Sequence, residues 1–167
     1  SIPRDFFKEK IERTGHKSNN YPFGVGMIFL PRTDFAAQEN ARTIVESEII
    51  REGLKIYGWR HVPINSSIIG DKAKATRPEI EQILIWNEKI QDEKEFDDKL
   101  YIIRKRIEKE IRSQNISDFY ICSLSCQSIL FLFSAVLHAS QTPLSSKFIV
   151  DFLVEITCWV SIAEFGL

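Results

Sequence analysis

The sequence predicts an α+β domain, in which short apolar strands alternate with amphipathic helices. In several charged segments apolar residues recur every three or four positions, which is the period of a helix with one buried face. Elsewhere, short runs of branched and aromatic residues end at Pro or Gly, as buried strands do. With 167 residues, of which 44% are hydrophobic and 27% charged, the chain is long enough for one globular core.

Three segments are expected to be helices. The first, residues 5–13, is short and polar and carries Phe6, Phe7 and Ile11 on one side. The second, residues 34–53, has Asp34 in the position of an N-cap. Its apolar residues are Ala37, Ala41, Ile44, Val45, Ile49 and Ile50. The third, residues 96–112, has the clearest pattern, with Phe96, Leu100, Ile103, Ile107 and Ile111.

Five segments are expected to be strands. The first is an apolar run that stops at Pro31, and the second is interrupted by Gly58 and ended by Pro63. The strand candidates are residues 24–30, 54–62, 80–86, 119–124 and 128–133. We expect a polar loop over residues 65–78 and an acidic linker over residues 91–95.

Composition argues against several classes of protein. The formal net charge of −1 gives no global field that would attract nucleic acid or an acidic membrane. Cys122, Cys126 and Cys158 are an odd number and form no disulfide framework, which favours a reducing, cytoplasmic setting. The apolar stretches 129–137 and 148–163 are interrupted by polar or charged residues, so neither predicts a membrane span.

Short motifs do not identify a ligand site. Gly24-Val25-Gly26 lacks the third glycine of a dinucleotide site and the Lys-Ser/Thr of a phosphate loop, so tight packing at a strand start explains it better. The basic run 104–106 is followed by Glu108 and Glu110, as on a solvated helix face, and does not predict nucleic-acid binding.

Cysteine and histidine residues also fail to form a recognisable site. Cys122 and Cys126 have no second close pair of ligands to complete a zinc site, so buried thiols are the better interpretation. His16 and His61 are far apart, and no serine lies in a strand-turn-helix elbow. We therefore assign no catalytic, cofactor-binding or metal-binding residue from the sequence.

An ordered series of segments nevertheless resembles the glutaminase domain of glutamate synthase large subunits, a class-II glutamine amidotransferase domain. The segments are residues 4–7 (RDFF), 21–31 (YPFGVGMIFLP), 53–63 (GLKIYGWRHVP), 75–82 (ATRPEIEQ), 100–111 (LYIIRKRIEKEI) and 118–125 (DFYICSLS). Their order and spacing match the family over about 120 residues.

The resemblance implies a four-layer α-β-β-α sandwich of the N-terminal-nucleophile hydrolase type, of which this chain would be a part that lacks strands at both ends. It implies L-glutamine as the substrate, attacked by a processed N-terminal cysteine, with glutamate and ammonia as products for glutamate biosynthesis. FMN and an iron–sulfur cluster are implied for regions outside this chain, and no cofactor is expected within it. An incomplete sandwich would expose sheet edges and favour self-association.

Departures from the family divide the chain into residues 1–125, the partial glutaminase core, and residues 126–167, a divergent apolar tail that a frame shift could explain. The family's nucleophilic cysteine and its glutamine-pocket segments find no match, so we expect the chain to be catalytically incompetent alone. The alternative is a relic or a non-catalytic domain that binds a partner. The matched residues Gly24, Gly26, Gly58, Trp59 and Pro63 are expected to support turns and packing.

Overall fold

The computed structural model describes residues 4–13, 21–64 and 70–127, which divide between two compact units. The larger unit comprises residues 1–63 and 78–129, and the smaller comprises residues 64–77 and 130–167. Within the smaller unit the described element is α3 (Asp71–Thr76). All other described helices and strands belong to the larger unit, which therefore contains the features discussed below.

A four-stranded antiparallel sheet forms the centre of the larger unit, in the order β2-β3-β1-β4. Its strands are β1 (Phe23–Leu30), β2 (Lys55–His61), β3 (Glu79–Trp86) and β4 (Tyr120–Ser125). The first strand is central, pairing with β3 from Phe23↔Trp86 to Leu30↔Glu79 and with β4 on its other side. Helices combined with an antiparallel sheet confirm the predicted α+β class.

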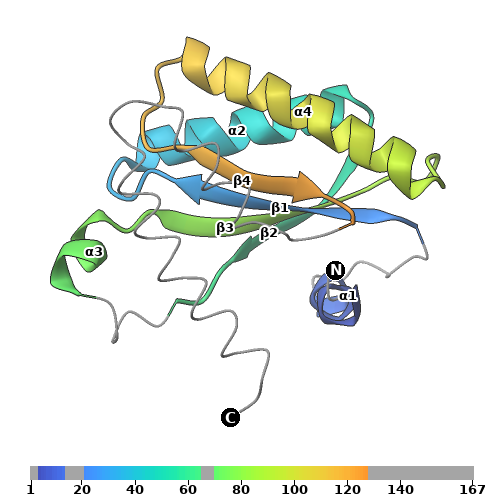
Figure 1. Ribbon diagram of the computed structural model, residues 1–167, viewed down its shortest axis with the longest axis horizontal. Coiled ribbons are helices and arrows are strands. Elements are labelled where there is room, and N and C mark those ends of the chain that lie inside the picture. Colours follow the sequence, from blue (N-terminus) through green and yellow to red (C-terminus); the bar gives the residue numbers. More distant parts are fainter. Residues whose placement is uncertain (1–3, 14–20, 65–69, 128–167) are drawn as a thin grey trace. The chain divides into compact units, whose positions relative to one another are not determined.

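Helices α2 (Phe35–Arg51) and α4 (Glu93–Ser113) cover one face of the sheet (Figure 1). Each presents its apolar stripe to the strands, and burying these stripes is the main source of their stability. The main core formed there includes Ile28, Leu30, Ile44, Val45, Ile49, Ile83, Ile85, Phe96, Leu100, Ile103 and Ile107. This packing confirms the helical periods expected for residues 34–53 and 96–112.

The opposite face of the sheet carries the short helix α1 (Arg4–Arg13), as Figure 1 shows. Phe7 and Ile11 of this helix are buried against the strands, whereas Phe6 stays 38% exposed. The second core cluster that they form includes Phe23, Val25, Tyr57 and Leu84. The sheet is thus apolar on both faces, which explains why β1 is buried along nearly its whole length.

The structure differs from the predicted elements at three places. The expected polar loop contains α3, which begins after Gly70. Helix α4 begins three residues early, inside the expected acidic linker, because the Asp92 carboxylate accepts hydrogen bonds from the backbone N–H groups of Lys94 and Glu95. Ile50, assigned to the apolar stripe, is 62% exposed near the end of α2. The candidate strand 128–133 lies outside the described residues.

Removing the cap of α4 should destabilise the fold by about 1 kcal/mol, since the two N–H groups that Asp92 satisfies would lose their protein acceptor. We expect Asp92→Ala to produce this loss in urea unfolding. The matched control is Asp98→Ala, because Asp98 is an exposed residue within the same helix. Equal unfolding midpoints for the two variants would contradict this role of Asp92.

Candidate functional site

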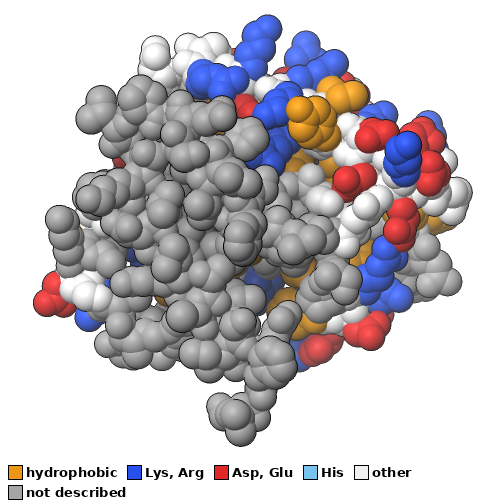
Figure 2. Space-filling model, viewed as in Figure 1, with side chains coloured by type: hydrophobic (Ala, Val, Ile, Leu, Met, Phe, Trp, Pro, Cys, Tyr) orange, Lys and Arg blue, Asp and Glu red, His pale blue; other side chains and the backbone are white. Residues whose placement is uncertain are grey.

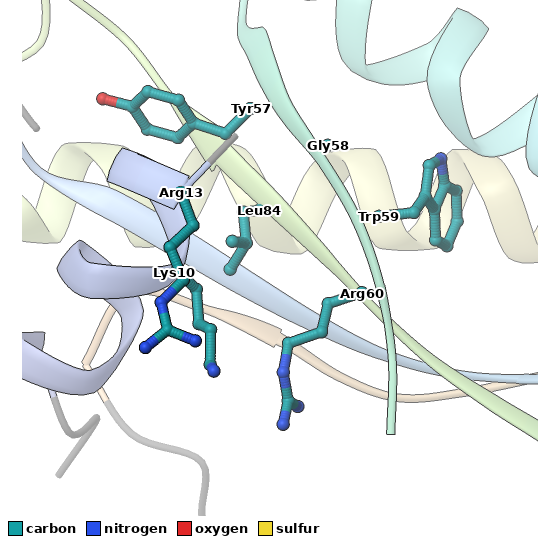
Figure 3. Close-up of a pocket in the computed structure, with 7 residues that line it drawn as sticks. All are labelled: Lys10, Arg13, Tyr57, Gly58, Trp59, Arg60 and Leu84. Carbon is teal, nitrogen blue, oxygen red and sulfur yellow. The ribbon is translucent and has the colours of Figure 1, made fainter. Parts of the chain in front are cut away.

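A cavity of about 200 Å³ lies between α1 and the sheet (Figure 3). Helix α1 contributes Lys10 and Arg13 to its lining, and β3 contributes Leu84. Strand β2 contributes the segment 57–60, Tyr-Gly-Trp-Arg. In the close-up the charged ends of the two helix residues and of Arg60 extend toward the same side of the cavity, whereas Tyr57 and Trp59 point elsewhere.

A bulge in β2 determines which side chains reach this cavity. The register between β2 and β3 shifts between Ile56 and Gly58, and Gly58 has a φ of +147°, a backbone conformation that residues with a side chain rarely adopt. Beyond the bulge, Trp59 packs against the main core, and its indole N–H donates a hydrogen bond to Glu46 Oε1 at 2.7 Å. Arg60 consequently lies on the face that carries α1.

Arg60 is held in place by two neighbours. Its guanidinium donates a hydrogen bond to Gln82 Oε1 at 2.7 Å, and its Cζ lies 5.0 Å from the centroid of the Phe6 ring. Lys10 approaches the same ring, with its Nζ 5.3 Å from the centroid. Partial burial lowers the pKa of Arg60, because removal from water disfavours the charged guanidinium. Arg13 forms an ion pair with Glu9, one turn earlier on α1.

Two buried cysteines are the thiols among the described residues, and neither is disulfide-bonded. Burial raises the pKa of Cys122 to about 11. Burial, together with the neighbouring carboxylate of Asp97, raises the pKa of Cys126 to about 12. The Cys126 Sγ donates a hydrogen bond to the carbonyl oxygen of Glu93 at 3.2 Å. Since the thiolate is the nucleophile, both cysteines are poorly suited to attack a substrate at neutral pH.

These thiols should therefore resist alkylation in the folded chain. We expect Cys122 and Cys126 to react with iodoacetamide far more slowly in buffer at pH 8 than in urea, as followed by peptide mass spectrometry. Folding favours the neutral thiols, so their contribution to stability is present below pH 9 and lost as the pH rises toward 11 to 12. Rapid labelling of either cysteine in the folded chain would contradict this assignment.

The histidine and basic-run positions form ordinary surface contacts. His61 Nδ1 lies 2.6 Å from Glu79 Oε1 at an exposed edge of the sheet, whereas His16 lies outside the described residues. Arg104 and Lys105 both pair with Glu108, and Arg106 pairs with Glu52. On the described part of the surface in Figure 2, basic and acidic side chains lie interspersed. This arrangement matches the solvated helix face expected from the sequence.

The described residues provide neither a metal-ligand cluster nor a helix that could span a membrane. Within residues 4–13, 21–64 and 70–127 no group of three or more His, Cys, Asp or Glu side chains could hold a metal ion. None of the helices in these ranges combines the length and apolar character that a membrane span requires. Arg42 and Glu81 instead form a paired charge between α2 and β3, at 2.7 and 2.9 Å, and hydrogen bonding to Glu81 raises the pKa of Arg42.

Comparison with known proteins identifies the family. The family model for class-II glutamine amidotransferases matches residues 1–151. The chain belongs to this family. The match confirms the resemblance expected from the sequence, and the relatives described next place the chain in the glutaminase domain of glutamate synthase large subunits. The family match also extends past Ser125, after which the sequence predicts a divergent tail. The structure does not describe residues beyond 127, so the boundary between core and tail stays a prediction.

Several glutamate synthases resemble this class-II amidotransferase chain. The NADPH glutamate synthase large chain of Azospirillum brasilense is 52% identical over 131 residues, which are 78% of this chain and 9% of that protein. The chloroplastic ferredoxin-dependent glutamate synthase 2 of Arabidopsis thaliana is 41% identical over 133 residues, 78% of this chain and 8% of its own. The large chain of Bacillus subtilis is 34% identical over 139 residues, with the same two shares. The chain thus spans less than a tenth of these relatives.

The sequence did not single out the charged groups around the cavity of this amidotransferase chain. Lys10 and Arg13 follow each other by three positions, which places them on one side of α1. That spacing was a readable signal. Arg60 lies within the segment 53–63 that resembles the family, but the sequence does not show which face of the sheet its side chain reaches. That face depends on the bulge at Gly58. A strictly alternating strand would have put Arg60 on the opposite face, with the helices α2 and α4.

Proposed function

We propose that this chain forms part of a glutaminase domain that hydrolyses L-glutamine to glutamate and ammonia for glutamate synthesis. The family match over residues 1–151 is the observation that carries this proposal. The names of the relatives, NADPH and ferredoxin-dependent glutamate synthases, supply the metabolic context. The chain covers less than a tenth of these proteins, so the complete glutamate synthase reaction is proposed from its similarity to them.

We propose that the described residues form the scaffold that supports the glutaminase active site. Amide hydrolysis by this family needs an activated nucleophile and donors for a tetrahedral oxyanion. Cys122 and Cys126 are buried and have raised pKa values, so we place the attacking group outside the described residues. We also place the flavin and iron–sulfur cluster elsewhere, in the regions of the relatives that this chain does not cover.

We also propose that the complete domain is a four-layer α-β-β-α sandwich. The described sheet would be one of its two central layers, with α2 and α4 as the adjacent outer layer. The apolar face that β1 and β2 present opposite α2 and α4, with Phe23, Val25 and Tyr57, supports this arrangement, because a four-layer sandwich buries both faces of each sheet. A cytoplasmic setting stays a proposal, supported by the absence of a disulfide at Cys122 and Cys126. Self-association through the edges of the sheet is also a proposal, supported by the unpaired sides of β2 and β4 among the described strands.

A chimeric enzyme would test the scaffold role. The matching segment of the Azospirillum brasilense large chain would be replaced by the corresponding residues of this chain, to which it is 52% identical. We expect the chimera to retain NADPH-dependent glutamate formation with glutamine as the nitrogen donor. It should also retain activity when Cys122 and Cys126 are both changed to Ser, because neither thiol is the proposed nucleophile.

Two outcomes would contradict this assignment. A chimera that forms glutamate from free ammonia but not from glutamine would show that the segment does not support glutaminase function. Loss of glutamine-dependent activity on thiol replacement, with ammonia-dependent activity unchanged, would assign one of these cysteines to the reaction. For the 167-residue chain by itself we propose no release of ammonia from glutamine above background, and release would overturn the inactive interpretation.

A further inference from the structure

Three basic residues are among those that line the cavity between α1 and β2. Lys10, Arg13 and Arg60 provide three cationic groups, and no Asp or Glu is among the described residues that line it. Three cations around one small cavity repel each other, most strongly where water is partly excluded. An anion bound between them would relieve that repulsion.

Two of these cations have no carboxylate partner within the part of the chain that the structure describes. Among the described residues, neither Lys10 nor Arg60 forms an ion pair, and both lie close to the ring of Phe6, at 5.3 and 5.0 Å from its centroid. Elsewhere on this chain, half-buried guanidinium groups do find partners, as Arg42 does with Glu81. Burial lowers the pKa of Arg60, as expected of a guanidinium that is partly removed from water and has no carboxylate partner among the described residues.

The third cation, Arg13, has a competing partner. Its ion pair with Glu9 lies on the exposed surface of α1, where both side chains are more than half exposed. Such surface pairs contribute little to stability, about 0 to 1 kcal/mol, so Arg13 can turn toward a ligand at small cost. Arg60 is positioned more firmly, because Gln82 Oε1 accepts a hydrogen bond from its guanidinium at 2.7 Å.

Size and wall chemistry limit the ligand. At about 200 Å³ the cavity is smaller than the range of about 300 to 1,000 Å³ that is typical of drug-sized ligands. Leu84 gives it an apolar side, and the remaining guanidinium donors of Arg60 suit a carboxylate or phosphate group. A compact oxyanion fits these properties, whereas a nucleotide is too large.

We propose that the cavity between α1 and β2 is a binding site for a compact oxyanion, a small carboxylate or phosphate, held by Lys10, Arg13 and Arg60. The site is separate from the proposed glutaminase reaction and does not depend on it. Ligand binding would join α1 to the sheet by bridging the helix cations and the strand cation. Occupancy therefore stabilises the docked position of α1 by mass action.

Isothermal titration calorimetry on the 167-residue chain at low salt would test the site, with succinate and inorganic phosphate as the two probes. We expect saturable binding of one equivalent of at least one probe. Arg60→Gln and Lys10→Gln should each weaken it about tenfold or more, the usual scale for a lost charge-assisted contact. The probe that binds more tightly distinguishes carboxylate from phosphate recognition.

Matched control variants distinguish binding at this cavity from a general effect of lowering the positive charge of the chain. Arg112→Gln and Lys94→Gln remove the same charges from exposed positions on α4, across the sheet from α1, and should leave binding unchanged. Arg13→Gln, on the exposed face of α1, serves as a further pocket variant if Arg60→Gln does not fold, as judged by far-ultraviolet circular dichroism. No saturable binding of either probe to the folded chain, or equal weakening by the control variants, would overturn the proposal.

Discussion

Replacing Phe96 by Ala is expected to lower the free energy of unfolding by about 3 to 5 kcal/mol, as large-to-small changes in a packed core do. Phe96 is fully buried in the first turn of α4, where it packs within the main core between the helices and the sheet. Its removal takes away the transfer free energy of the ring and leaves a cavity that rigid neighbours fill only in part. Urea unfolding followed by circular dichroism would measure the change.

Phe35 provides the matched control for this variant. It is the first residue of α2 and is 74% exposed, so Phe35→Ala should change stability by no more than about 0.5 kcal/mol. Similar losses for the two variants would mean that the described core does not hold α4 on the sheet. A loss near zero for Phe96→Ala would contradict the packing of this helix.

Gly26→Ala should destabilise the chain by about 2 to 3 kcal/mol, through overpacking at the centre of the sheet. A Cβ atom at Gly26 would lie 2.6 Å from Ile83 Cγ2 and 3.0 Å from Leu124 Cδ1. The Cγ2 methyl of Ile83 is fixed to a branched carbon on the paired strand, so the backbones of β1 and β3 would have to separate. Thermal and urea unfolding would measure this loss.

Gly24→Ala is the matched control, because Gly24 lies on the same strand and the same face. Its added Cβ would meet Leu100 Cδ1 at 2.6 Å, but that methyl is the end of a flexible side chain and can move aside. The loss should therefore be smaller than for Gly26→Ala. Equal losses would show that β1 tolerates or rejects a methyl group irrespective of its neighbours.

Local periodicity was enough to locate most helices and strands. The apolar residues of α4 follow the helical period without interruption, and each of the five predicted is buried. Strand β1 was visible because an unbroken apolar run ended at Pro31. Ile50 was misassigned because it follows the buried Ile49 by one position, about 100° around the helix, which directs it to solvent.

Long-range geometry could not be read in the same way. Nothing in the sequence near β1 states that its neighbours are β3 and β4 rather than β2, which follows it in the chain. The cavity depends on the docking of α1 and on the side of the sheet that Arg60 reaches, and both arise from tertiary packing. The family, by contrast, was accessible because its segments recur in order along the chain.

The central position of β1 has a consequence for synthesis on the ribosome. This strand is made before either of its partners, one of which begins at Glu79 and the other at Tyr120. Until both have emerged, β1 offers an apolar ribbon with unpaired backbone groups on each side, which is a template for aggregation. The strand order thus gives the domain a high contact order, so we expect it to fold slowly and to need protection by chaperones until β4 has left the exit tunnel.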